Sequence, residues 1–119
     1  MKAIRILLAD DHQIIRDGIK LMLKKSSEFD IVHEAANGQE VIDYLSSYTD
    51  AIDVVLMDIN MPEKNGIEAT QHISDYIKGV KVLALTMHAE ETYITSMLKA
   101  GALGYVLKES GTEELMSAI

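Results

Sequence analysis

The sequence predicts an α/β fold in which helices cover a parallel sheet. Along its 119 residues, apolar runs of strand length alternate five times with segments of helical period. This alternation is typical of repeated β-α units. Turn-forming pairs such as Asn37-Gly38 and Asn65-Gly66 separate the elements, and no Ser/Gly linker interrupts them. We therefore expect residues 1–119 to form one domain with no internal boundary.

The five expected strands are short apolar runs followed by polar or turn-forming residues. The run at residues 54–57 contains no polar side chain, as expected for a strand buried in a sheet. The strands are expected at residues 4–9, 30–35, 53–57, 81–85 and 104–107.

Apolar residues three or four positions apart predict the helices between these strands. The expected apolar faces include Tyr48 in the second helix and Leu98 in the fourth, which Gly101 ends. A fifth helix begins near Thr112, and we expect it to be truncated at Ile119 because seven residues are short for a globular helix. The four complete helices are expected at residues 13–25, 38–48, 66–77 and 90–100.

The composition indicates a compact acidic domain and excludes several classes of function. Nineteen acidic against eleven basic residues give a net charge of −8, a sign that repels the phosphate backbone of nucleic acids. The absence of cysteine excludes disulfides and thiolate metal sites and fits a cytoplasmic location. No apolar stretch approaches the roughly 20 residues that a membrane-spanning helix needs, so no membrane association is expected.

Polar side chains follow four of the predicted strands at their carboxyl ends. Asp10 and Asp11 follow the first strand, Asp58 the third, Thr86 the fourth and Lys108 the fifth. Ligands of open α/β sheets bind beyond the carboxyl ends of the strands, where strand order reverses. We therefore expect three carboxylates, a hydroxyl and an ammonium to share one pocket.

Three neighbouring carboxylates call for a cation, because like charges at close range raise one another's pKa. Oxygen ligands with positions left for water and phosphate favour Mg²⁺, whereas the usual loop motif of a calcium site is absent. A carboxylate that accepts a phosphoryl group also needs donors on the transferred oxygens, over which the transition state spreads negative charge. Thr86 and Lys108 are suited to that role, and the turn after Asp58 could add a backbone carbonyl to the metal.

Each of these residues also has a structural interpretation. Adjacent aspartates often cap a helix, Thr86 could be an N-cap, and Lys108 could be a surface lysine after an edge strand. The occurrence of such residues at all four strand ends favours a functional site. The histidines, His12 among them, show no metal-ligand spacing, so we interpret them as packed or exposed side chains.

This set of residues resembles the receiver domain of two-component response regulators. The aspartates, threonine and lysine are accompanied by Met61-Pro62 and Asn65-Gly66 after the central aspartate. Residues 9–12, 85–89 and 101–105 resemble the NarL/FixJ branch, whose output domains are of the LuxR type. The resemblance implies a flavodoxin-like receiver fold with strand order 2-1-3-4-5 and five flanking helices.

The resemblance also implies the metal site and the phospho-acceptor. Asp58 would accept the phosphoryl group, and Mg²⁺ would be held by Asp11, Asp58 and the Asn60 carbonyl. Asp10 would reach the metal through water.

A switch is implied at the other strand ends. Thr86 and Lys108 would bind the phosphoryl group, and Tyr105 would turn inward when Thr86 does. Two positions depart from many receivers: Glu109 replaces the proline after the lysine, and Met87 replaces the small residue directly after the threonine.

The implied function is transcription regulation by phosphorylation. A histidine kinase or phosphotransfer protein would be the phosphoryl donor, and the phosphorylated chain would form a homodimer. DNA would be bound only by a C-terminal helix-turn-helix domain absent from this chain. The domain would be no enzyme, with only self-phosphorylation and slow self-dephosphorylation. The alternatives are a phosphorylation-independent pseudo-receiver and a metal-dependent phosphohydrolase with Asp58 as nucleophile.

Overall fold

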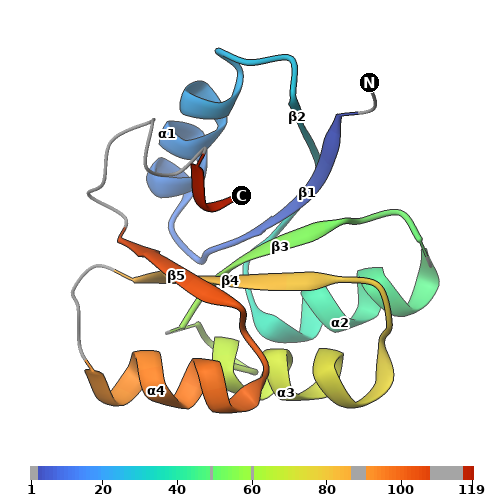
Figure 1. Cartoon of the computed structure of the whole chain (residues 1–119), viewed down its shortest axis with the longest axis vertical. Coiled ribbons are helices and arrows are strands. Elements are labelled where there is room, and N and C mark those ends of the chain that lie inside the picture. The colour runs from blue at the N-terminus through green and yellow to red at the C-terminus, as the bar shows by residue number, and fades with distance from the viewer. Residues whose placement is uncertain (1–2, 49, 60, 87–90, 108–116) are drawn as a thin grey trace.

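The computed structural model describes residues 3–48, 50–59, 61–86, 91–107 and 117–119, in which strands and helices alternate as expected (Figure 1). The strands are β1 (Ile4–Ala9), β2 (Phe29–Ala35), β3 (Val54–Asp58), β4 (Lys81–Thr86) and β5 (Gly104–Leu107). The helices are α1 (Gln13–Leu23), α2 (Gly38–Ser47), α3 (Gly66–Tyr76) and α4 (Glu91–Ala100).

The strands form one parallel sheet in the order β2-β1-β3-β4-β5, which confirms the predicted fold class. Helices α2, α3 and α4 lie on one face of the sheet, and α1 lies on the other (Figure 1). Alternate side chains of the central strands serve the two faces, so that Leu7 and Val55 pack with α2 and α3, whereas Ile6 and Leu56 pack with α1. Two apolar cores therefore hold the sheet between its helices.

The predicted element boundaries lie within two residues of the observed ones, and those of β1 and β5 agree at both ends. Asp58 and Thr86 are the last residues of β3 and β4 rather than the first residues after them, and α1 ends at Leu23 rather than at residue 25. The side chains at the carboxyl edge are therefore held by the sheet itself.

Two residues assigned to apolar helix faces are exposed instead. Tyr48 caps the C-terminus of α2 with non-helical backbone angles, and its ring lies against Tyr44, with 4.7 Å between ring centroids. Leu98 follows Met97, which occupies the core position on α4 and is fully buried. Successive helix positions are about 100° apart, and on α4 this rotation turns Leu98 away from the core that Met97 contacts.

The predicted fifth helix falls largely on residues 108–116, outside the described residues. Ser117 and Ala118 are helical, and Ile119 packs against the core beneath α1. In the described part of the chain, no helix is both long enough and apolar enough to cross a membrane.

Candidate functional site

The acidic residues meet because β1 and β3 are neighbouring parallel strands. Ala9 pairs with Met57, so Asp10 and Asp58 follow at the same level on the carboxyl edge. Asp10 is fully buried, and Asp58 is 5% exposed. Ligand atoms of Asp10, Asp11, Asp58 and His12 all lie within 4.8 Å of one another. The structure thus brings together the three carboxylates that the sequence predicted to be close.

The orientation of Asp10 is fixed by its own turn. Its backbone N–H donates to the carbonyl of Ala35 at 3.0 Å, and its Oδ1 accepts the backbone N–H of His12 at 2.9 Å. A side chain that bonds the backbone two residues on forms an Asx turn. This turn leaves the Asp11 side chain partly exposed beside the buried Asp10.

His12 joins this cluster, which the sequence interpretation missed. Its Nδ1 lies 3.2 Å from Asp10 Oδ1 and 3.0 Å from Asp11 Oδ1, while its side chain remains 66% exposed. A single histidine without ligand spacing carries no metal-site signal. Only its position two residues after a turn-forming aspartate could have indicated the contact.

The loop between β3 and α3 is anchored at both ends. Gly66 donates its N–H to the Ile59 carbonyl at 2.8 Å, and Gly38 at the start of α2 donates to the Lys64 carbonyl at 2.7 Å. A Cβ atom added at Gly66 would overlap the backbone carbonyl oxygen of Asp58 and lie 3.0 Å from its carbonyl carbon. Only glycine therefore lets α3 begin this close to the Asp58 backbone.

Asn65 caps α3 through a reciprocal pair of hydrogen bonds. Its side chain accepts the Glu68 N–H at 2.9 Å, and the Glu68 carboxylate accepts the Asn65 N–H at 3.3 Å. This capping box satisfies donors that the first turn of a helix otherwise leaves without partners. The start of α3, and with it the close approach to Asp58, is thereby fixed.

The predicted switch residues lie on the two strands beyond Asp58. Thr86 ends β4 and is buried, and it pairs in the sheet with Leu107 of β5. Tyr105 on β5 is 47% exposed, so its ring is directed outward in this structure. Two predicted site residues, Asn60 and Lys108, lie outside the described residues, as do Met87 and Glu109.

The donor set fits a hard divalent cation. Asp10, Asp11 and Asp58 offer carboxylate oxygens close enough to share one ion, and oxygen is the ligand that Mg²⁺ prefers. Two of the three carboxylates are buried, where mutual repulsion is weakly screened by solvent. A bound cation would offset that repulsion.

Comparisons with known proteins agree with this geometry. Residues 6–119 match the model of the response regulator receiver domain. The chain is 42% identical over 116 residues to the transcriptional regulatory protein DegU of Brevibacillus brevis, covering 98% of this chain and 48% of that protein. The chain thus spans about half the length of this relative.

Solved structures give the same assignment. The signal receiver domain of the putative response regulator NarL from Mycobacterium tuberculosis superposes with a TM-score of 0.91 at 28% identity, covering 99% of this chain and 94% of that one. A LuxR-family two-component response regulator from Aurantimonas sp. SI85-9A1 gives a TM-score of 0.88 at 36% identity, covering 98% and 82%. The chain belongs to the response regulator receiver domains, and these relatives are regulators of the NarL/LuxR type.

Proposed function

We propose that this receiver domain is a switch that accepts a phosphoryl group on Asp58 with Mg²⁺ bound beside it. The observation that carries this proposal is the meeting of three carboxylates, from the ends of two neighbouring strands, within 4.8 Å. Burying two like charges together costs free energy. A bound metal ion that takes part in a reaction would offset this cost. A receiver domain is a signalling module rather than an enzyme.

In the proposed reaction, a carboxylate oxygen of Asp58 attacks the phosphorus of a phosphohistidine on a histidine kinase or phosphotransfer protein. The P–N bond breaks, and the leaving imidazole takes up a proton. Asp10, Asp11 and Asp58, with the carbonyl of Asn60, would hold Mg²⁺. When bound, Mg²⁺ neutralises charge on the transferred oxygens.

Two further residues are proposed to bind the phosphoryl group. Thr86 would donate its hydroxyl to a phosphoryl oxygen, and Lys108 would supply a positive charge. The buried position of Thr86 at the end of β4, two strands from Asp10, supports this role.

We also propose that the whole protein regulates transcription in the cytoplasm. The relative named above is a transcriptional regulatory protein about twice as long as the matched region. A helix-turn-helix domain outside this chain would bind DNA, since the receiver carries a net charge of −8. Phosphorylation would act through a homodimer of receivers.

Phosphorylation should occur on Asp58 and on no other residue. After incubation with acetyl phosphate and Mg²⁺, intact mass should show the gain of one phosphoryl group. Asp58→Asn should show none, because the amide is a poor nucleophile, whereas Asp43→Asn on the exposed face of α2 should behave as the parent. Phosphorylated Asp58→Asn would contradict the assignment. A parent without uptake would indicate a pure interaction module, and multiple turnover would indicate a phosphohydrolase.

Thr86→Ala should still accept the phosphoryl group but should switch incompletely. Hydrogen bonds to charged groups contribute about 1.5–3 kcal/mol each, and reversing a 1:99 equilibrium needs about 5.5 kcal/mol. Thr86 and Lys108 together approach that value, but neither reaches it alone. The Tyr105 ring, outward in this structure, is the reporter: its NMR shift on phosphorylation should be smaller in Thr86→Ala.

Thr95→Ala is the matched control, since it removes a hydroxyl from an exposed position on α4. It should show the full Tyr105 shift. Equal shifts in the parent and Thr86→Ala would show that Thr86 does not couple Asp58 to Tyr105.

A further inference from the structure

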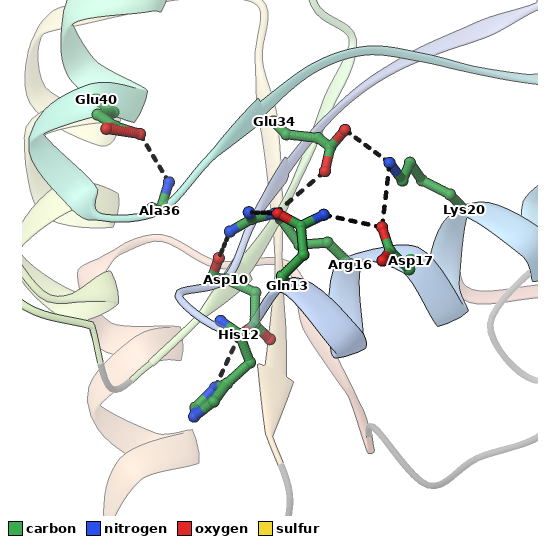
Figure 2. Close-up of polar contacts among 9 residues, drawn as sticks. All are labelled: Asp10, His12, Gln13, Arg16, Asp17, Lys20, Glu34, Ala36 and Glu40. Atoms are coloured by element: carbon green, nitrogen blue, oxygen red, sulfur yellow. Dashed lines mark hydrogen bonds and ion pairs between the residues drawn. The ribbon is translucent and has the colours of Figure 1, made fainter.

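Arg16 connects α1 to the loop that begins with Asp10 and Asp11 (Figure 2). Its Nη1 donates to the backbone carbonyl of Asp10, its Nε donates to Glu34 Oε1 at 3.1 Å, and its Nη2 donates to Gln13 Oε1. The Arg16 side chain is only 13% exposed. Three acceptors on three parts of the fold therefore hold one guanidinium in place.

The acceptors lie where they can fix the loop. Asp10 is the first residue after β1, and Glu34 lies on β2 and pairs in the sheet with Leu8 of β1. The planar guanidinium fork is pre-organised, so it loses less rotamer freedom per hydrogen bond than a flexible ammonium. Arg16 thus ties the peptide of Asp10 to a neighbouring strand that does not itself contribute a carboxylate to the cluster.

We propose that Arg16 is a positioning residue for the metal-holding loop: its bonds to the Asp10 carbonyl and Glu34 set the orientation of Asp10 and Asp11 for Mg²⁺. This inference rests on the proposed function, because it concerns the same Mg²⁺ site. Partners behind metal ligands typically contribute 10- to 100-fold to metal affinity. Loss of Arg16 should reduce Mg²⁺ affinity within that range.

The direction of the change in Mg²⁺ affinity when Arg16 is replaced distinguishes a positioning role from an effect of its charge. Arg16 is a cation close to an acidic cluster, so its charge alone repels Mg²⁺. Removing that charge should then strengthen Mg²⁺ binding. Positioning predicts the opposite, because an unheld Asp10–Asp11 turn loses the orientation that the metal requires.

Lys20 supplies a matched control. Its Nζ lies 3.0 Å from Glu34 Oε2 and 3.4 Å from Asp17 Oδ1 (Figure 2). The hydrogen bond to Glu34 raises the pKa of Lys20, which favours the charged amine. Like Arg16, Lys20 lies on α1, carries a positive charge and contacts Glu34. Its contacts with Glu34 and Asp17 lie outside the loop formed by residues 10–12.

The experiment measures Mg²⁺ affinity by calorimetric titration of the parent, Arg16→Gln, Arg16→Lys and Lys20→Gln. Arg16→Gln should bind Mg²⁺ about 10- to 100-fold more weakly, and Lys20→Gln should bind as tightly as the parent or more tightly. Arg16→Lys should also bind weakly, because one ammonium keeps the charge but cannot reach all three acceptors. Full affinity in both Arg16 variants would overturn the proposal.

Hydrogen exchange in metal-free protein gives a second readout that needs no Mg²⁺. The His12 amide, which donates to Asp10 Oδ1, should lose protection in Arg16→Gln and keep it in Lys20→Gln. Protection unchanged in Arg16→Gln would overturn positioning while leaving Mg²⁺ binding by the parent intact. A parent that fails to bind Mg²⁺ would instead overturn the proposed function, and exchange would still decide the role of Arg16. Thermal unfolding of each variant shows whether it is folded, and only folded variants are compared in the two measurements.

Discussion

Gly66→Ala is expected to destabilise the domain by about 1–3 kcal/mol and to impair phosphorylation of Asp58 severely. The added Cβ would overlap the carbonyl oxygen of Asp58 and lie 3.0 Å from the Cα of Ile59. Both neighbours are backbone atoms, so no flexible side chain can yield. Separating them would stretch the 2.8 Å hydrogen bond from Gly66 to Ile59 and displace the residue that accepts the phosphoryl group.

Gly18→Ala is the control for this prediction. A Cβ at Gly18, within α1, would meet no atom within 4 Å. Alanine is favoured over glycine in a helix interior, so this variant should be more stable by about 0.5–1 kcal/mol. Urea unfolding measures the two stabilities, and mass after acetyl phosphate treatment measures the reaction. Parent-like stability and phosphorylation of Gly66→Ala would refute the close-approach argument.

Asp11→Asn is expected to abolish Mg²⁺ binding and phosphorylation while stabilising the metal-free domain. Asp11 is one of three carboxylates with ligand atoms within 4.8 Å. Two like charges about 4 Å apart repel by about 1 kcal/mol in water and by more near a protein surface. Losing one charge should therefore raise the free energy of unfolding by about 1 kcal/mol, which raises Tm by roughly 4 °C.

Asp43→Asn separates this local effect from a change in total charge. Both substitutions take the net charge from −8 to −7, by the loss of one negative charge. Asp43 is exposed on α2 and lies outside the acidic cluster. Thermal unfolding in the presence of a chelator should show a higher Tm for Asp11→Asn but not for Asp43→Asn. Calorimetry should show loss of Mg²⁺ binding for Asp11→Asn but not for Asp43→Asn. If Asp11→Asn lowers Tm, the repulsion argument is wrong.

The fold class and the meeting of the three carboxylates could both be predicted from the amino-acid sequence. Both follow from local pattern, because alternating apolar runs define β-α units and the residue after each run must lie at the carboxyl edge of a parallel sheet. Asp10, Asp11 and Asp58 could therefore be assigned to one site before any contact was known.

The other residues that support this site are identified by contacts between elements of the folded domain. The reach of Arg16 to Glu34 on another strand and the approach of Gly66 to Asp58 join residues whose spacing in sequence has no characteristic period. The exposure of Tyr48 likewise depends on where α2 ends against its surroundings. Hydrophobic periodicity reports which face of an element is buried, but side-chain direction and backbone approach are set by packing between elements.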